Sequence, residues 1–131
     1  MSQEQYKSQG ERKIARFLTD YGLDFIYEQP LLVNDYGKRR LWYPDYTLPE
    51  YATIIEYFGG VGDEDYNRGI FRKTKAYSEL YLNLIPMFPD SFEGNWQART
   101  IEKIGQGLEN RVRSFYGKVG YGRAGKVSYR G

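Results

Sequence analysis

Two short stretches rich in aromatic and β-branched residues constrain the fold of this chain more than any other feature. Residues 42–48 and 53–59 each have the composition of a β-strand, and the turn-like segment 49–51 separates them. Each stretch carries one carboxylate among apolar neighbours, Asp45 in the first and Glu56 in the second. A carboxylate on an apolar strand costs free energy unless it is paired or holds a cation. If the two strands form a hairpin, the carboxylates converge at one edge of a sheet, and such oxygen ligands suit Mg²⁺ or Mn²⁺.

Hydrophobic periodicity predicts three helices around these strands. They are expected over residues 8–21, 65–81 and 96–116. Ser8 is placed to cap the first helix, and Gly22 is placed to end it. The third helix contains Gly105 and Gly107, each of which weakens a helix by about 1 kcal/mol relative to Ala. We therefore expect a bend or a break near these two glycines.

The remaining strands and turns complete a mixed fold. Further strands are expected over residues 25–31 and 82–88. A turn is predicted at 34–37, after which the basic segment 38–40 would lead into the strand that contains Asp45. The resulting order is helix, strands, helix, strand and helix. This order predicts an α/β core in which helices pack against a small mixed sheet.

The composition excludes several classes of site. The chain has no Cys and no His, which removes disulfides, thiolate and imidazole zinc sites, and Ser-His or Cys-His nucleophiles. Its 131 residues fit one domain, which we expect to span residues 1–116. No stretch approaches the roughly 20 apolar residues of a membrane span, and the polar first residues do not resemble a secretory signal. We therefore expect a soluble, cytoplasmic protein that does not associate with membranes.

The charge is unevenly distributed along the chain. The net charge is only +2, and residues 1–110 hold 13 Lys and Arg against 17 Asp and Glu. Residues 111–131 hold six Lys and Arg and no acid. A basic tail rich in Gly and Tyr, residues 117–131, is therefore expected to follow the domain.

Four residues together suggest one chemistry, although each has a simpler explanation. Glu11 lies on the apolar side of the first helix, where a capping box with Ser8 would also account for it. On the second helix Lys73 shares the apolar face, whereas a lysine two residues later falls on the opposite, solvent side. Asp45 and Glu56 could bind a divalent metal, with Glu11 completing or orienting the ligand set. Lys73 could position the attacking water or offset charge that develops on a phosphate.

At these positions the chain resembles the PD-(D/E)xK nuclease superfamily. The resemblance rests on Gly10-Glu11, Pro44-Asp45 and Ile54-Ile55-Glu56, and it covers about residues 8–88. The superfamily's usual lysine lies two residues after the second acid, where this chain has Phe58. Some branches carry the lysine on the following helix instead, and Lys73, with Tyr77 four residues on, is similar to that variant.

The resemblance implies a restriction-endonuclease-like core, with a mixed sheet of about four strands flanked by helices. It implies Mg²⁺-dependent (or Mn²⁺-dependent) hydrolysis of phosphodiester bonds, usually in DNA. The implied catalytic residues are Glu11, Asp45, Glu56 and Lys73, and the first three are the implied metal ligands. Residues 1–116 would then form a single nuclease domain.

The small size of the chain favours a structure-specific endonuclease. Stand-alone members of the superfamily often act as dimers on branched DNA, as Holliday-junction resolvases do in recombination and repair. A two-fold homodimer would present two sites to two strands. A restriction or mismatch-type nicking endonuclease is an alternative with the same chemistry. A catalytically inactive DNA-binding module and an unrelated α/β interaction protein are alternatives of other classes.

Basic residues in two regions are candidates for contacts with nucleic acid. They are Lys38, Arg39 and Arg40 after the predicted turn, and Arg111, Arg113, Lys118, Arg123, Lys126 and Arg130 towards the C-terminus. Aromatic residues among the latter could stack on unpaired bases. The first cluster could equally be a solvated loop, and the tail could be a disordered, solubilising end.

Overall fold

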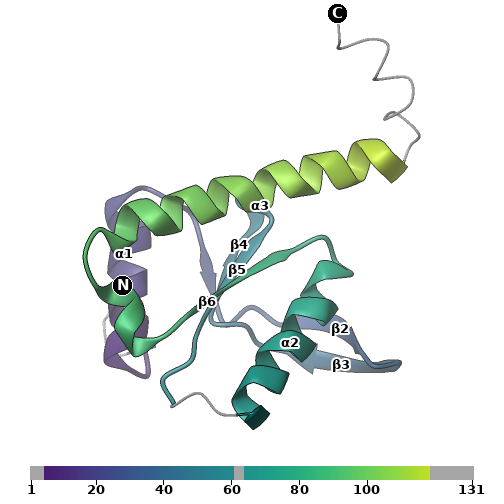
Figure 1. Ribbon diagram of the computed structural model, residues 1–131, viewed down its shortest axis with the longest axis horizontal. Helices are drawn as coiled ribbons and strands as arrows, with labels where there is room; N and C mark the ends of the chain where they lie inside the picture. The colour runs from purple at the N-terminus through teal and green to yellow at the C-terminus, as the bar shows by residue number, and fades with distance from the viewer. Residues whose placement is uncertain (1–4, 61–63, 119–131) are drawn as a thin grey trace, which may run out of the picture.

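A four-stranded mixed sheet forms the centre of the molecule (Figure 1). The computed structural model describes residues 5–60 and 64–118. The strand order is β1-β4-β5-β6. The strands are β1 (Ile26–Tyr27), β4 (Tyr46–Leu48), β5 (Thr53–Tyr57) and β6 (Asn83–Met87). The first three pair antiparallel, and β6 pairs parallel to β5, so the prediction of a mixed α/β fold is confirmed.

A separate two-stranded hairpin stands beside this sheet. Its strands are β2 (Leu31–Asp35) and β3 (Lys38–Trp42). The two-residue turn between them places Tyr36 and Gly37 at φ +52° and +88°, the backbone that tight hairpins favour. The predicted turn at 34–37 is therefore confirmed.

The predicted boundaries of two strands were wrong around this hairpin. The expected strand 25–31 is interrupted because Glu28 adopts φ +53° and Pro30 cannot donate to a strand ladder. The basic residues of β3 do not lead into the Asp45 strand either, because Pro44 separates β3 from β4. The hairpin is consequently an independent element rather than part of the central sheet.

The first helix, α1 (Gln9–Asp20), has the predicted ends. Its N-cap is Ser8, whose Oγ accepts a hydrogen bond from the Glu11 N–H. At its C-terminus Gly22 adopts φ +68°, and the N–H groups of Gly22 and Leu23 donate to the carbonyls of Thr19 and Leu18. These are the two bonds of a Schellman motif, which requires a residue that tolerates positive φ.

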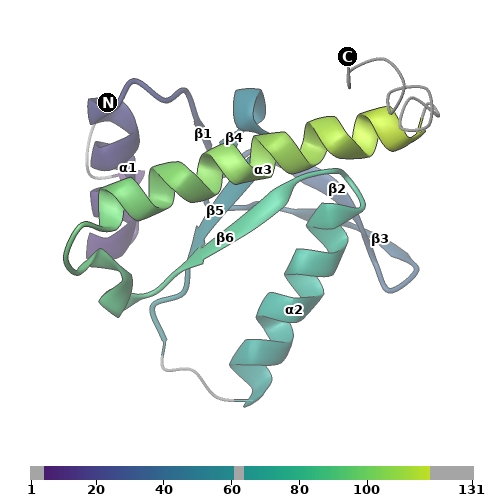
Figure 2. The ribbon, with the colours of Figure 1, turned by 45° about the horizontal axis from the view of Figure 1, so that its top comes forward.

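The helices cover both faces of the sheet (Figure 2). Because side chains alternate along a strand, Ile55 points to one face and Ile54 to the other. On the Ile55 face the core includes residues of α1 and of α3 (Trp96–Lys118). On the Ile54 face it includes residues of α2 (Glu64–Ser78) and of strand β2. Short 3₁₀ turns, η2 (Pro49–Tyr51) and η3 (Pro89–Phe92), follow β4 and β6.

Helix α3 is continuous, so the predicted bend or break at its glycines was wrong. Gly107 is buried where α3 crosses the starts of β5 and β6. A Cβ atom at Gly107 would lie 2.7 Å from Thr53 Oγ1 and 3.0 Å from Asn83 Cβ. The position therefore serves close helix–sheet packing, and that packing offsets the weak helix propensity of glycine. None of the helices in residues 5–60 and 64–118 is both long and apolar enough to cross a membrane.

We predict opposite effects on stability for alanine at the two glycines of α3. Gly107→Ala should lower the free energy of unfolding by about 1–3 kcal/mol, because the methyl group overpacks the contact with Thr53. Gly105→Ala is the matched control, since nothing lies within 4 Å of its Cβ position, and it should stabilise the protein by up to about 1 kcal/mol. Urea unfolding of both variants checks this, and equal effects would contradict the packing role.

Candidate active site

Asp45 and Glu56 lie side by side at one end of the central sheet. In the β4–β5 register Tyr46 pairs with Ile55, so Glu56 follows on β5 and Asp45 lies opposite it, immediately before β4. The Tyr57 N–H donates to Asp45 Oδ2 at 2.8 Å. The predicted hairpin is therefore confirmed for β4 and β5, and it brings Asp45 beside Glu56. The expected strand 42–48 was wrong in its first half, because Trp42 belongs to β3 and residues 43–45 lie in no strand.

Helix α2 contributes two side chains to Glu56. Lys73 Nζ lies 2.7 Å from Glu56 Oε1, and the Tyr77 hydroxyl donates to Glu56 Oε2 at 2.5 Å. The two positions are four residues apart, so they share one face of the helix. Glu56 is 5 % exposed, and both of its carboxylate oxygens are engaged by α2.

Lys73 approaches Glu56 beside Phe58, the residue that stands where the resemblance places the usual lysine. Its Nζ lies 5.3 Å from the centre of the Phe58 ring, within the range of a cation–π contact. Lys75, by contrast, is exposed, and its ammonium lies 3.9 Å from Glu79. The predicted helix phase, with Lys73 inward and Lys75 in solvent, is confirmed.

Glu11 is buried at the start of α1 and is held from two sides. Its Oε1 accepts hydrogen bonds from the Tyr27 hydroxyl at 2.6 Å and from the Lys7 N–H at 3.1 Å. The predicted capping box was half right, because the Glu11 carboxylate bonds to Lys7 and not to the Ser8 N–H. Gly10 sets how closely α1 approaches the sheet, since a Cβ atom there would lie 2.2 Å from the Tyr57 ring.

The pKa of Asp45 depends on the charges of the other three predicted site residues. Burial raises the pKa of Asp45, the Tyr57 N–H opposes that shift, and the result is a pKa of about 6. The charges of Glu11 and Glu56 raise the pKa further, and the charge of Lys73 lowers it. Lys73 thus contacts Glu56 directly, and Glu11, Glu56 and Lys73 all lie within electrostatic range of Asp45.

The carboxylate oxygens have the chemistry that Mg²⁺ prefers, but they are unequally available. The second oxygens of Asp45 and Glu11 accept no hydrogen bond among the described residues, whereas Lys73 and Tyr77 occupy Glu56. In the part of the chain that the structure describes, no three acidic side chains lie close enough to form a ready-made metal cluster. Asp45 therefore offers an available oxygen beside Glu56, and the ligand roles of Asp45, Glu56 and Glu11 stay predictions.

Two tyrosines complete the site, and sequence reasoning gave neither a role. Tyr77 was visible in the pattern as the residue four positions after Lys73. Tyr27 gave no signal, because its contact with Glu11 depends on the pairing of β1 with β4. Burial raises the pKa of both hydroxyls, and their bonds to Glu56 and Glu11 raise it further. They are therefore neutral donors that orient the two carboxylates.

The basic residues of the hairpin differ in their surroundings. Lys38 and Arg39 are exposed, and neither pairs with a carboxylate in the described ranges. Arg40 instead lies 2.8 Å from the buried Asp35, which also binds Arg72 of α2 through two hydrogen bonds. These guanidinium groups hold the pKa of Asp35 below its usual range. Arg40 thus has a structural partner, which the prediction of a DNA contact did not include.

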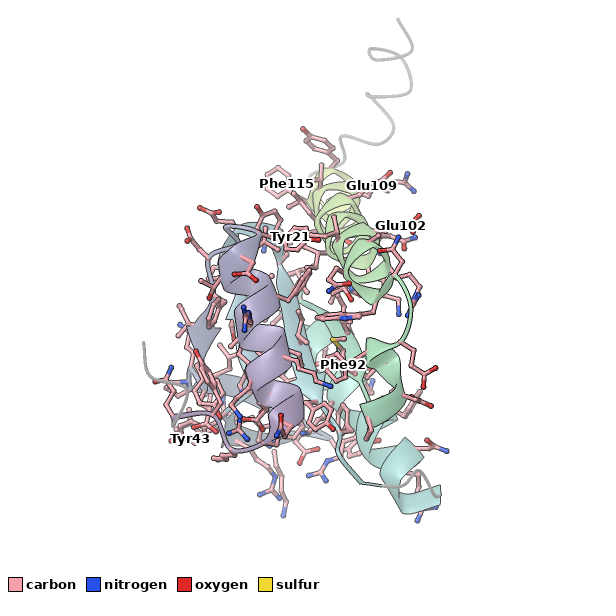
Figure 3. The ribbon with its side chains drawn as sticks, turned by 90° about the vertical axis from the view of Figure 1, so that its left-hand side faces the viewer. Tyr21, Tyr43, Phe92, Glu102, Glu109 and Phe115 are labelled. Atoms are coloured by element: carbon pink, nitrogen blue, oxygen red, sulfur yellow. The ribbon has the colours of Figure 1, made fainter. Side chains whose placement is uncertain are left out.

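Two basic residues of α3 that were predicted to contact nucleic acid, Arg111 and Arg113, lie far from the site. Gly107 marks where α3 passes the start of β5, whereas Glu56 is near the end of that strand, and Arg111 and Arg113 follow Gly107. Figure 3 shows the same separation, with Phe115 of α3 and Tyr43, two residues before Asp45, at opposite ends of the molecule. Arg113 also pairs with Glu109 at 2.5 Å. The side chain of Lys118, and the residues Arg123, Lys126 and Arg130, lie outside the described residues.

Comparison of the chain with protein-family models, with curated proteins and with solved structures found no match. The geometry around Asp45 therefore carries the functional proposal.

The pKa of Asp45 predicts how stability depends on pH in a chelating buffer. Because the folded pKa of about 6 exceeds the unfolded value of about 4, the folded state binds more protons between those values. The contribution of Asp45 to stability is therefore lost as the pH rises through that range. Asp45→Asn keeps an acceptor for the Tyr57 N–H without the buried charge, so it should be more stable than the wild type by about 1–3 kcal/mol at neutral pH.

Urea unfolding of both proteins from acid to neutral pH checks this prediction. The difference should shrink towards zero below about pH 4, where Asp45 is protonated in both states. Asp24→Asn, at an exposed position, is the control and should leave the pH dependence unchanged. A stability difference that does not vary with pH would show that Asp45 is not buried as a costly anion.

Proposed function

We propose that this chain is a metal-dependent endodeoxyribonuclease with a restriction-endonuclease-like core of the PD-(D/E)xK type. The observation that carries the proposal is the 2.7 Å contact between Lys73 and Glu56, beside Phe58 and next to Asp45. The second helix thus supplies a cation to the two strand carboxylates although the usual lysine position is aromatic. Two acids can hold a divalent metal and a lysine can offset charge on a phosphate, and this chemistry needs no histidine, which the chain lacks.

In this proposal Asp45 and Glu56 hold a divalent cation. When bound, Mg²⁺ supplies a water of lowered pKa and positive charge to offset the charge on the reacting phosphate. The free oxygen of Asp45 is its most accessible ligand. Glu56 Oε1, which contacts Lys73, would bind the cation instead, while the Tyr77 hydroxyl keeps the carboxylate oriented through Oε2.

Lys73 has the second role in the reaction. Its side chain is 36 % exposed, so the ammonium contacts both Glu56 and solvent. A phosphate oxygen arriving from solvent can therefore receive a charge-assisted hydrogen bond from Lys73. The contact with Glu56 and with Phe58 fixes the position of the ammonium before substrate binds, which is the preorganisation that stabilises developing charge.

Branched DNA is the proposed substrate, cleaved by a homodimer of Holliday-junction resolvase type. The support for it is the small size of the domain, whose site lies at one end of the sheet without a separate sequence-reading domain in the described ranges. A restriction or nicking activity uses the same site and remains the second candidate. A non-catalytic DNA-binding module is the third, favoured by the engagement of both Glu56 oxygens with α2.

A cleavage assay with Mg²⁺ or Mn²⁺ on junction, flap, single-stranded and linear duplex DNA tests the proposal. The wild type should cleave at least one of these substrates, and chelation should stop it. Asp45→Asn should abolish cleavage while DNA binding measured in the chelator persists, since Asp45 supplies ligand charge and not phosphate contacts. Wild-type protein that cleaves nothing with either metal would leave only the binding-module function.

The lysines of α2 provide a matched pair of variants. Lys73→Met should reduce the cleavage rate by about 100-fold or more, because it removes a preorganised cation from the reacting phosphate. Lys75→Met removes the same charge from the same helix at an exposed position and should change the rate little. Single-turnover kinetics separate this effect from binding. Equal losses in the two variants would mean that Lys73 acts only through net charge.

A further inference from the structure

We propose that the β2–β3 hairpin is a β-ribbon that binds double-stranded DNA next to the active site. This inference rests on the proposed function and names the element that holds the substrate. One face of the ribbon is anchored to the protein, and the opposite face, which we call the outer face, is exposed. A two-stranded β-ribbon fits the width of the major groove of DNA.

The cross-strand register separates the two faces of the ribbon. Val33 is 2 % exposed and packs into the core with Ile54 and Leu84. Leu32 and Leu41 are direct cross-strand partners, and each is 53 % exposed. Residues adjacent on a strand point to opposite faces, so this leucine pair belongs to the outer face. The pair is a large apolar surface with no cover in the described parts of the chain.

The positive charge of the exposed residues near the turn favours nucleic acid as the ligand of the ribbon. Arg39 lies on β3 two residues before Leu41, so it belongs to the outer face. Lys38 lies at the turn end of the ribbon, opposite Asp35. Both are exposed and pair with no carboxylate of the described residues. Tyr36 at the turn is 64 % exposed. Two uncompensated cations beside apolar and aromatic side chains complement a polyanion whose grooves display sugars and base edges.

The anchored face fixes the ribbon relative to the catalytic residues. Arg72 of α2 binds Asp35 of β2, and its guanidinium lies 5.6 Å from the centre of the Trp42 ring. Trp42 in turn packs edge-on against Tyr77 at 5.8 Å between ring centres. Arg72 precedes Lys73 directly, so the helix that supplies the lysine also holds the ribbon. Binding on the outer face therefore requires no rearrangement of the site.

The covalent path from the ribbon to the site is short. Only Tyr43 and Pro44 separate the end of β3 from Asp45, and the Tyr43 side chain is 58 % exposed. A duplex lying along the outer face would therefore run towards Asp45. The ribbon is the closest set of uncompensated basic residues in sequence to that acid, whereas Arg111 and Arg113 lie at the far end of the sheet.

The test measures binding of the full chain to a short blunt-ended DNA duplex over a series of salt concentrations, in chelator, by fluorescence anisotropy. The double variant Lys38→Gln/Arg39→Gln should lower affinity at least tenfold and reduce the slope of log K against log [salt] by about 2, roughly one for each lost phosphate contact. The matched control Arg111→Gln/Arg113→Gln removes the same charge from α3 and should leave the slope within about half a unit of the wild type.

A third variant separates groove contact from general charge attraction. Leu41→Ala should weaken binding severalfold with an unchanged salt slope, because it removes apolar contact and no cation. Thermal unfolding controls for folding, and the exposure of all substituted side chains favours intact structure. Sedimentation of the wild type and Leu41→Ala tests whether the leucine pair instead joins two copies of the chain, an outcome that would overturn the proposal.

The outcomes distinguish this inference from the proposed function because binding is measured without metal and without cleavage. Hairpin-dependent binding by a protein that cleaves nothing would uphold the ribbon and overturn the nuclease. Cleavage with unchanged binding in the hairpin variants would uphold the nuclease and overturn the ribbon. Absence of duplex binding by the wild type would also overturn the ribbon.

Discussion

The contact of helix α2 with Glu56 is the interaction on which the arrangement of this protein depends. Glu56 is a buried carboxylate on a central strand, and such a group is costly unless its oxygens are satisfied. Lys73 and Tyr77 satisfy both oxygens, and this places α2 across the Ile54 face of the sheet. The same helix then fixes the hairpin through Arg72 and Asp35. A single buried charge thus organises the site, the helix over it and the ribbon beside it.

Local patterns in the sequence predicted those parts of the site that depend on periodicity. The aromatic and β-branched composition of the two stretches, with the turn between them, was sufficient to place Asp45 beside Glu56, although Trp42 belongs to β3. The helical phase was sufficient to turn Lys73 inward. The hairpin was not foreseen as a separate sheet, because that depends on the left-handed backbone of Glu28. Tyr27 was missed for a related reason, since a contact between β1 and α1 is set by tertiary packing and has no local signature. The continuity of α3 through Gly107 is likewise decided by the sheet beneath it.

The distribution of cations in the fold differs from their distribution in the sequence. The sequence concentrates positive charge after residue 110, which directs attention to the C-terminus. In the fold, Arg111 and Arg113 of α3 lie at the opposite end of β5 from Glu56. The few cations of the hairpin, by contrast, are separated from Asp45 by a short connection. The short connection in sequence to Asp45, rather than their number, distinguishes Lys38 and Arg39 from Arg111 and Arg113.

The close approach of Gly10 to the Tyr57 ring links the two halves of the site mechanically. Tyr57 presents its ring to α1 and its backbone N–H to Asp45, so one residue spaces the helix acid from the strand acid. A single methyl group at position 10 would have to displace either that ring or the start of α1. A chain could therefore keep every charged residue of this site and still lose its geometry. The presence of the acids and the lysine would not reveal such a loss, whereas a residue other than glycine at position 10 would indicate it.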